Sequence, residues 1–281
     1  MFFLDSIKRS LYMIVPFAAY YVMYALFTSI GKLIYGMAVA DGGETADFMR
    51  AHAQSYKSWS AVCVYVLLVI GLWILFNKSD PLENRLIKEK KGFIRILLNV
   101  FFFGGSAAVF LNILAGYIVD LLKIDTSGTS SFNTDTPFVP GLLLFVFLSP
   151  LVEEMTFRWL TFGRIKKNIN VPAALVVSSL FFGVIHGDAV KAVYAFIMGF
   201  IMALIYQLSG TFVLAVVFHM AANAFIFIPP YMLKCGGASE GAGLATGVVM
   251  LLLSVVFGWL VYGVCDQRSL ERQVPVRSGR L

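Results

Sequence analysis

Apolar residues fill long runs of this sequence, and short polar stretches separate the runs. A transmembrane helix needs about 20 consecutive, mainly apolar residues, and about eight segments satisfy that requirement. They are Leu11–Ala38, Ser60–Phe76, Ile96–Leu121, Phe138–Phe162, Val171–Gly187, Val190–Leu208, Thr211–Ile228 and Gly243–Val264. The pattern therefore predicts an all-α, polytopic membrane protein with about eight transmembrane helices.

The composition agrees with this fold class. Of the 281 residues, 59% are hydrophobic and 14% are charged, whereas soluble domains have roughly 45–50% apolar and about 25% charged residues. The net charge of +6 does not indicate a nucleic-acid partner, because the basic residues lie in connections between apolar runs. The three cysteines, Cys63, Cys235 and Cys265, lack the spacing of a disulfide framework or a zinc site.

The basic residues predict how the chain lies in the membrane. Fifteen Lys and Arg residues fall in connections on one side and five on the other. The larger group includes Arg164 and the stretch Lys78–Gly92, which we expect to be a solvated loop. Because Lys and Arg are enriched in cytoplasmic loops, we predict a multi-pass protein of the cell membrane with both termini in the cytoplasm. The first apolar run exceeds the roughly 7–15 apolar residues of a signal peptide, so we expect it to remain as a span.

A few strongly polar side chains lie inside the predicted spans. They are Glu153, Glu154, Arg158, His186, His219 and Asn223. A charged or polar group in the bilayer interior is costly unless it has a partner. These residues are therefore expected to be paired or functional.

Helical spacing relates these residues to one another. Glu154 and Arg158 are four positions apart, so they share a helix face and can form an ion pair. Glu153 is turned from Glu154 by about 100° and can face elsewhere. His219 and Asn223 are also four positions apart and project to one place. A rise of ~1.5 Å per residue puts Glu153, the two histidines and the asparagine at similar depths, roughly 12–21 Å from the cytoplasmic boundary.

Such a set of side chains has the chemistry to hydrolyse an amide bond. A carboxylate such as that of Glu153, assisted by a histidine, can take a proton from water. A histidine and an asparagine amide can donate hydrogen bonds to the developing oxyanion. Arg158 can hold the second carboxylate, Glu154, in place.

Three motifs carry a family resemblance. They are Glu153-Glu154-x-x-x-Arg158, Phe182-x-x-x-His186 and His219-x-x-x-Asn223, in this order and in separate predicted spans. In these motifs the sequence resembles the CPBP family, also called Abi, which includes the type II CAAX prenyl endopeptidases and bacterial relatives linked to bacteriocin processing or self-immunity. The resemblance covers roughly residues 140–228, and it departs from the family pattern at Trp159, where a glycine is common.

The resemblance implies an intramembrane glutamic endopeptidase. Glu153 would activate water with His186, His219 and Asn223 would form the oxyanion hole, and the other two charged residues of the first motif would support the site. It implies no metal or other cofactor, and a peptide or membrane-protein substrate within the lipid bilayer. The chain would divide into N-terminal helices with a cytoplasmic loop (1–125), a CPBP-like catalytic core (136–230), and an outer loop with the last helix and a basic tail (231–281).

Three other functions stay open at this point. A zinc protease could use His186, His219 and a glutamate as ligands, although no His-Glu-x-x-His motif is present. A non-catalytic immunity or scaffold protein could bind a peptide or membrane partner. A transporter could use Glu153 as a proton carrier, but the inverted repeats that would support transport are not visible. The sequence indicates neither the substrate nor the oligomeric state.

Overall fold

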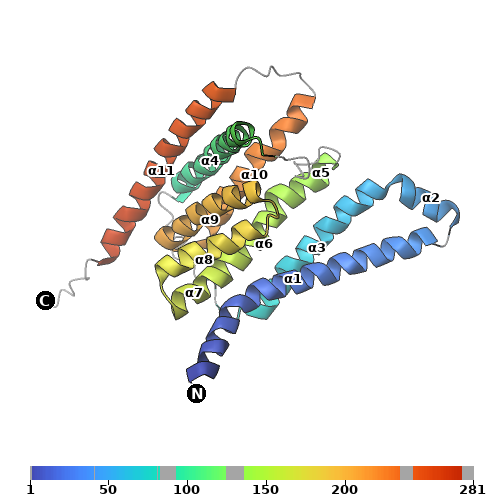
Figure 1. Ribbon diagram of the computed structural model, residues 1–281, viewed down its shortest axis with the longest axis horizontal. Helices are drawn as coiled ribbons and strands as arrows, with labels where there is room; N and C mark the ends of the chain where they lie inside the picture. Colours follow the sequence, from blue (N-terminus) through green and yellow to red (C-terminus); the bar gives the residue numbers. More distant parts are fainter. Residues whose placement is uncertain are drawn as a thin grey trace.

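The computed structural model describes residues 2–40, 42–80, 82, 93–124, 136–234 and 243–273. Within these ranges all regular elements are helices (Figure 1). They are α1 (Phe2–Ala40), α2 (Gly43–Ala51), α3 (Ala53–Phe76), α4 (Phe93–Leu122), α5 (Phe138–Gly141), η2 (Leu142–Leu148), α6 (Ser149–Glu154), η3 (Met155–Phe162), α7 (Gly163–Asn168), α8 (Val171–Val184), α9 (Ala189–Ser209), α10 (Phe212–Lys234) and α11 (Gly243–Gln273). The predicted all-α class is confirmed.

Seven stretches of the described residues are long and apolar enough to cross a membrane. They are Leu11–Ala40, Ala53–Phe76, Phe93–Leu122, Phe138–Asn168, Ala189–Ser209, Phe212–Pro229 and Ala245–Cys265. The predicted polytopic membrane protein is confirmed, and each of these stretches overlaps one predicted span.

The remaining predicted span, Val171–Gly187, forms a shorter helix than expected. Helix α8 has 14 residues, which gives a length of about 21 Å at ~1.5 Å per residue, against a hydrocarbon core of about 30 Å. The helix ends because Gly187 adopts a φ of +87° and Asp188 accepts a hydrogen bond from Lys191 N as the N-cap of α9. The described residues therefore contain seven full-length candidate spans and one short apolar helix, where the sequence predicted about eight spans.

Helix α10 occupies the centre of the bundle. It packs against α4, α9, α6 and both π-helical segments, while α4 also packs against α11. Helices α1 and α3 pack together on one edge, and α11 lies on the opposite edge (Figure 1). The start of α1 and the end of α11 lie toward the same end of the bundle (Figure 1).

Small residues allow α4 and α10 to approach closely. Gly104 and Gly105 on α4 are buried, and a Cβ atom on Gly104 would lie 2.3 Å from the backbone oxygen of Phe218. Close approach through small residues is typical of helix packing in membranes. The contact fixes the position of Phe218, the residue that directly precedes His219.

A buried ionic cluster joins the end of α3 to α1 and α7. Arg164 Nη2 donates to Asp80 Oδ2 at 2.7 Å, and the Tyr12 hydroxyl donates to Asp80 Oδ1 at 3.0 Å. The indole Nε1 of Trp159 donates to the backbone oxygen of Asp80 at 2.8 Å. Burial raises the pKa of Asp80, but hydrogen bonds led by those from Arg164 outweigh it, so this pKa lies below its ordinary value.

This cluster corrects two expectations. Asp80 lies in the stretch predicted to be a solvated loop, and Arg164 was counted among the loop cations, yet they are only 4% and 3% exposed. Their pairing links positions 84 residues apart, so no local pattern could predict it. The indole hydrogen bond to Asp80 also gives a structural reason for Trp159, the position at which the sequence departs from the family pattern. Residues 83–92 of the predicted loop lie outside the described residues.

Candidate active site

The two glutamates lie at the end of a short α-helix between two π-helical segments. Helix α6 begins at Ser149 and ends at Glu154, with η2 before it and η3 after it. Pro150 lies in the first turn of α6 and donates no backbone hydrogen bond to the preceding η2 segment. Short π-helical segments occur frequently at functional sites, and here they bracket both carboxylates.

Glu154 forms a buried ion pair with Arg158, as their spacing predicts. Arg158 Nη1 lies 2.7 Å from Glu154 Oε1, and the two side chains are 1% and 0% exposed. Arg158 Nη2 donates to the backbone oxygen of Gly199 at 3.1 Å, and the guanidinium carbon lies 4.4 Å from the ring centroid of Phe182. Because Arg158 also contacts Gly199 and Phe182, this ion pair fixes the position of the segment that carries both glutamates.

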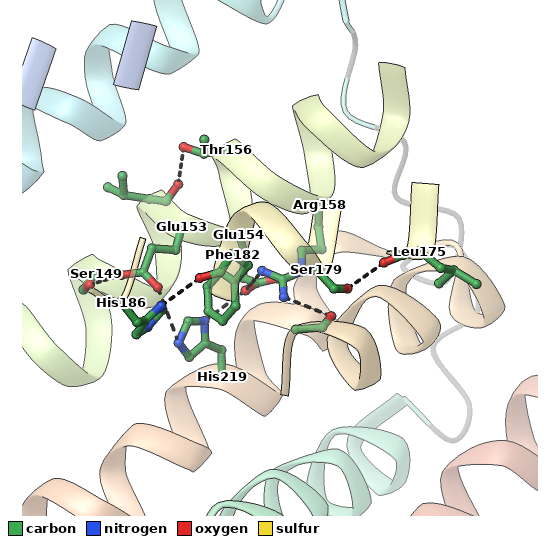
Figure 2. Close-up of polar contacts among 12 residues, drawn as sticks. Ser149, Glu153, Glu154, Thr156, Arg158, Leu175, Ser179, Phe182, His186 and His219 are labelled. Carbon is green, nitrogen blue, oxygen red and sulfur yellow. Dashed lines mark hydrogen bonds and ion pairs between the residues drawn. The ribbon is translucent and has the colours of Figure 1, made fainter. Parts of the chain in front are cut away.

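His219 lies between the two glutamates (Figure 2). Its Nδ1 lies 2.9 Å from Glu154 Oε1, and its Nε2 lies 3.8 Å from Glu153 Oε2. The other oxygen of Glu153, Oε1, accepts a hydrogen bond from the hydroxyl of Ser149. Glu153 and His219 are 9% and 6% exposed. The structure therefore brings Glu153, Glu154, Arg158 and His219 into one polar cluster.

His186 lies beside this cluster, outside any helix. The sequence places it within a span, but the structure places it in the turn between α8 and α9, because α8 ends at Val184. Its Nδ1 lies 2.8 Å from the backbone oxygen of Phe182. The Phe182 ring contacts both histidine rings, with centroid separations of 4.9 Å to His186 and 5.6 Å to His219.

Asn223 lies one turn after His219 on α10. Its Nδ2 donates to the backbone oxygen of Phe145 in η2 at 2.8 Å, and the residue is partly exposed. No hydrogen bond among the described residues joins His186 or Asn223 to Glu153. The structure thus places these two side chains around the cluster without a direct bond to the predicted base.

One site residue was missed by the sequence analysis. Ser149 is four positions before Glu153, and the spacing rule that paired Glu154 with Arg158 would also have paired these two. Among the described residues, no group of three or more His, Cys, Asp or Glu side chains is arranged to hold a metal ion.

Comparisons with known proteins found a family model and a relative that this chain resembles. Residues 135–225 match a family model described as "Type II CAAX prenyl endopeptidase Rce1-like", and this region contains all six predicted site residues. A Bacillus subtilis (strain 168) protein named "Putative membrane peptidase YdiL" is 27% identical over 221 residues, which cover 77% of this chain and 85% of that protein. No solved structure matches the chain. Both matches agree with the resemblance to the CPBP family that the motifs carry.

Proposed function

We propose that this chain is an intramembrane endopeptidase that hydrolyses a peptide bond with a water molecule activated by Glu153. The observation that carries the proposal is the position of His219, whose two ring nitrogens face one glutamate each. The match to the prenyl endopeptidase family model and the name of the Bacillus relative support the same class of reaction.

Glu153 is the better base of the two glutamates. Oε1 of Glu154 already accepts hydrogen bonds from Arg158 and His219, so this carboxylate is engaged in holding those two side chains. Among the described residues, no Lys or Arg forms an ion pair with Glu153, and the 3.8 Å between its Oε2 and His219 Nε2 is too long for a hydrogen bond. A water oxygen to the side of this pair, about 2.8 Å from each atom, could lose a proton to Glu153.

His219 can stabilise the oxyanion of the tetrahedral intermediate through Nε2. Because its Nδ1 contacts the carboxylate of Glu154 at 2.9 Å, Nδ1 carries a proton. Donation from Nε2 then requires the doubly protonated ring. The carboxylate of Glu154 holds Nδ1 and so orients the ring with Nε2 toward Glu153. Removal of Glu154 should therefore weaken this role of His219.

We assign His186 and Asn223 the roles that the motifs imply: His186 assists Glu153 in activating water, and Asn223 donates to the oxyanion. Donation from His186 Nδ1 to the Phe182 oxygen leaves Nε2 as the acceptor in the neutral ring, so His186 can take a proton during the reaction. Asn223 uses one amide hydrogen on Phe145 and has a second one that can reach an oxyanion. Both assignments are testable by substitution with residues that cannot donate or accept.

The substrate is proposed to be a peptide or a segment of a membrane protein within the lipid bilayer. Glu153 lies in the stretch Phe138–Asn168, which is long enough to cross a membrane. We further propose that both termini face the cytoplasm, since the positive-inside rule assigns the more basic connections to that side.

The experiment that tests this function compares peptides from membranes that contain the wild-type protein or the Glu153→Gln variant. The glutamine keeps the volume and can still accept from Ser149, but it cannot act as a base, so cleavage by the purified variant should fall by about 10²-fold or more. Glu44→Gln, an exposed substitution in α2, is the matched control and should cleave at the wild-type rate. Wild-type cleavage by Glu153→Gln would refute the assignment of the base.

Two alternatives give different outcomes in the same assays. If no peptide differs between wild type and Glu153→Gln, a non-catalytic binding protein is favoured. If a zinc chelator abolishes cleavage after prolonged exposure and added zinc restores it, the zinc protease is favoured. We expect cleavage to survive the chelator, since the proposed reaction uses only protein side chains.

A further inference from the structure

His186 differs from the other five predicted site residues because it lies in a turn and not in a helix. The turn joins α8 to α9 and runs from Ile185 to Asp188. His186 N donates to the backbone oxygen of Gly183 at 3.1 Å, and the backbone oxygen of His186 accepts from Asp188 N at 3.1 Å. The second bond closes a three-residue γ-turn around Gly187, whose φ of +87° favours glycine. The backbone that carries the imidazole is therefore bound to α8 on one side and to Asp188 on the other.

Asp188 connects this turn to α9. Its carboxylate uses both oxygens in the first turn of that helix. Oδ1 accepts a hydrogen bond from Lys191 N at 2.8 Å, and Oδ2 lies 3.1 Å from Lys191 Nζ. The backbone oxygen of Asp188 accepts from Ala192 N at 2.8 Å. An aspartate at this position caps the helix, because its side chain binds a backbone N–H that has no partner within the helix.

Helix α9 provides a firm support for this cap, because it packs closely on α8. A Cβ atom on Gly183 would lie 2.7 Å from the backbone oxygen of Ala192, so the two helix backbones touch beside the turn. Further along α9, the backbone oxygen of Gly199 accepts a hydrogen bond from Arg158, the partner of Glu154. The start of α9 therefore has a fixed place relative to the glutamates.

We propose that Asp188 is a positioning residue, which holds the His186 imidazole in the active site by capping α9. This inference rests on the proposed function, in which His186 assists Glu153. Without the cap, the first turn of α9 loosens, and His186 is held mainly by its contacts with α8, which include the 2.8 Å between its Nδ1 and the Phe182 oxygen. A displacement of about 1 Å in a catalytic group can lower a rate by about 10²-fold.

Substitutions of Asp188 with and without a capping side chain test the inference. Asp188→Ala removes the cap, so kcat should fall by about 10-fold or more, while KM changes little because Asp188 acts on His186 and not on the substrate. Asp188→Asn and Asp188→Ser keep a side-chain acceptor, and both residue types cap helices about as well as aspartate does. Each should therefore recover most of the lost rate, although neither can form the ion pair with Lys191.

Asn170 provides a matched control, because it caps α8 in the same way that Asp188 caps α9. Its Oδ1 accepts a hydrogen bond from Ala173 N at 2.8 Å. This cap lies at the start of α8, a helix of 14 residues, and so about 21 Å from the end that leads to His186. Asn170→Ala should lower Tm by about as much as Asp188→Ala, since both remove one cap, and should keep the wild-type kcat.

NMR of the histidine rings reports on His186 without any substrate. The chain contains 3 histidines, so the purified protein with isotopically labelled imidazoles gives few signals, and His186→Gln identifies those of His186. These signals should shift in Asp188→Ala, return toward the wild-type positions in Asp188→Asn, and stay unchanged in Asn170→Ala. A loss of stability without displacement of His186 would not produce this pattern.

The outcomes separate this inference from the proposed function. If Asp188→Ala keeps the wild-type kcat while Glu153→Gln is inactive, the inference is overturned and the proposed function stands. The inference is also overturned if both capping variants are as slow as Asp188→Ala, or if Asn170→Ala is equally slow. If Glu153→Gln cleaves at the wild-type rate, the proposed function fails, and the histidine signals then decide whether Asp188 positions His186.

A second pair of variants decides the case in which Asp188→Ala does not fold. Gly187→Ala adds a Cβ that meets no atom within 4 Å but disfavours the positive φ of the γ-turn. Gly210→Ala disfavours a similar φ of +67° at the other end of α9. Gly187→Ala should lower kcat by about 10-fold and shift the His186 signals, and Gly210→Ala should do neither. Equal effects of the two variants would overturn the inference.

Discussion

The two adjacent glutamates are expected to differ in what they do for the protein. Glu154 is fully buried, and its Oε1 receives hydrogen bonds from Arg158 at 2.7 Å and His219 at 2.9 Å. In Glu154→Gln the arginine stays buried without a countercharge. Removing one partner of a buried ion pair destabilises proteins by about 3–5 kcal/mol, which corresponds to a decrease in Tm on the order of 10 °C. Glu154→Gln should therefore lose both stability and activity.

Glu153 should behave in the opposite way. Among the described residues, the one ion-pair partner it has is His219 Nε2, at 3.8 Å, and a glutamine can still accept the hydrogen bond from Ser149. We expect Glu153→Gln to melt within about 2 °C of wild type, since the free energy of unfolding should change by less than about 1 kcal/mol, and to be inactive.

The assay is thermal unfolding of the purified variants in one detergent, together with cleavage of one peptide. A double variant, Glu154→Gln with Arg158→Met, removes both charges and should melt closer to wild type than Glu154→Gln alone, because a buried pair can often be replaced by apolar groups at little cost. Asp47→Asn is the control, since its ion pair with Arg50 is exposed and should contribute about 0–1 kcal/mol. If Glu153→Gln melts far below wild type while Glu154→Gln is stable and inactive, the two roles are reversed.

Three further predictions concern packing, pH and topology. Gly104→Ala should lower both Tm and cleavage, because its Cβ would lie 2.3 Å from an α10 backbone oxygen; Gly116→Ala, where the added Cβ meets open space, should change neither. Asp80→Asn should lower Tm at neutral pH. Because the pKa of Asp80 is depressed in the folded state, its contribution to stability is fully present above about pH 4 and is lost as the pH falls further. The difference in Tm between the variant and wild type should therefore shrink in acid. Cysteines introduced at Ser130 and Ser278, which lie outside the described residues, should be labelled from opposite sides of the membrane, and labelling of both from one side would contradict the predicted orientation.

The helices and their membrane character could be predicted from the sequence because both depend on local properties. A helix that crosses the bilayer must be apolar along its length, so its run of residues is visible without knowledge of any partner. The same reasoning identified Glu154 and Arg158 as a pair, because four positions on one helix define their separation. It also identified His219 as a candidate site residue, because a polar side chain inside a membrane helix is costly unless it is paired or functional.

The tertiary structure decided which groups meet. Hydropathy continues through His186 to Gly187, so it overestimated α8, whose end depends on a positive φ at Gly187 and the cap at Asp188. The contact of His219 with Glu154 spans 65 residues, and that of Arg164 with Asp80 spans 84. A sequence pattern reports that a residue will be buried or will need a partner. Which partner it finds depends on how distant helices pack, and at this site the packing of α10 against α6 places one histidine between two glutamates.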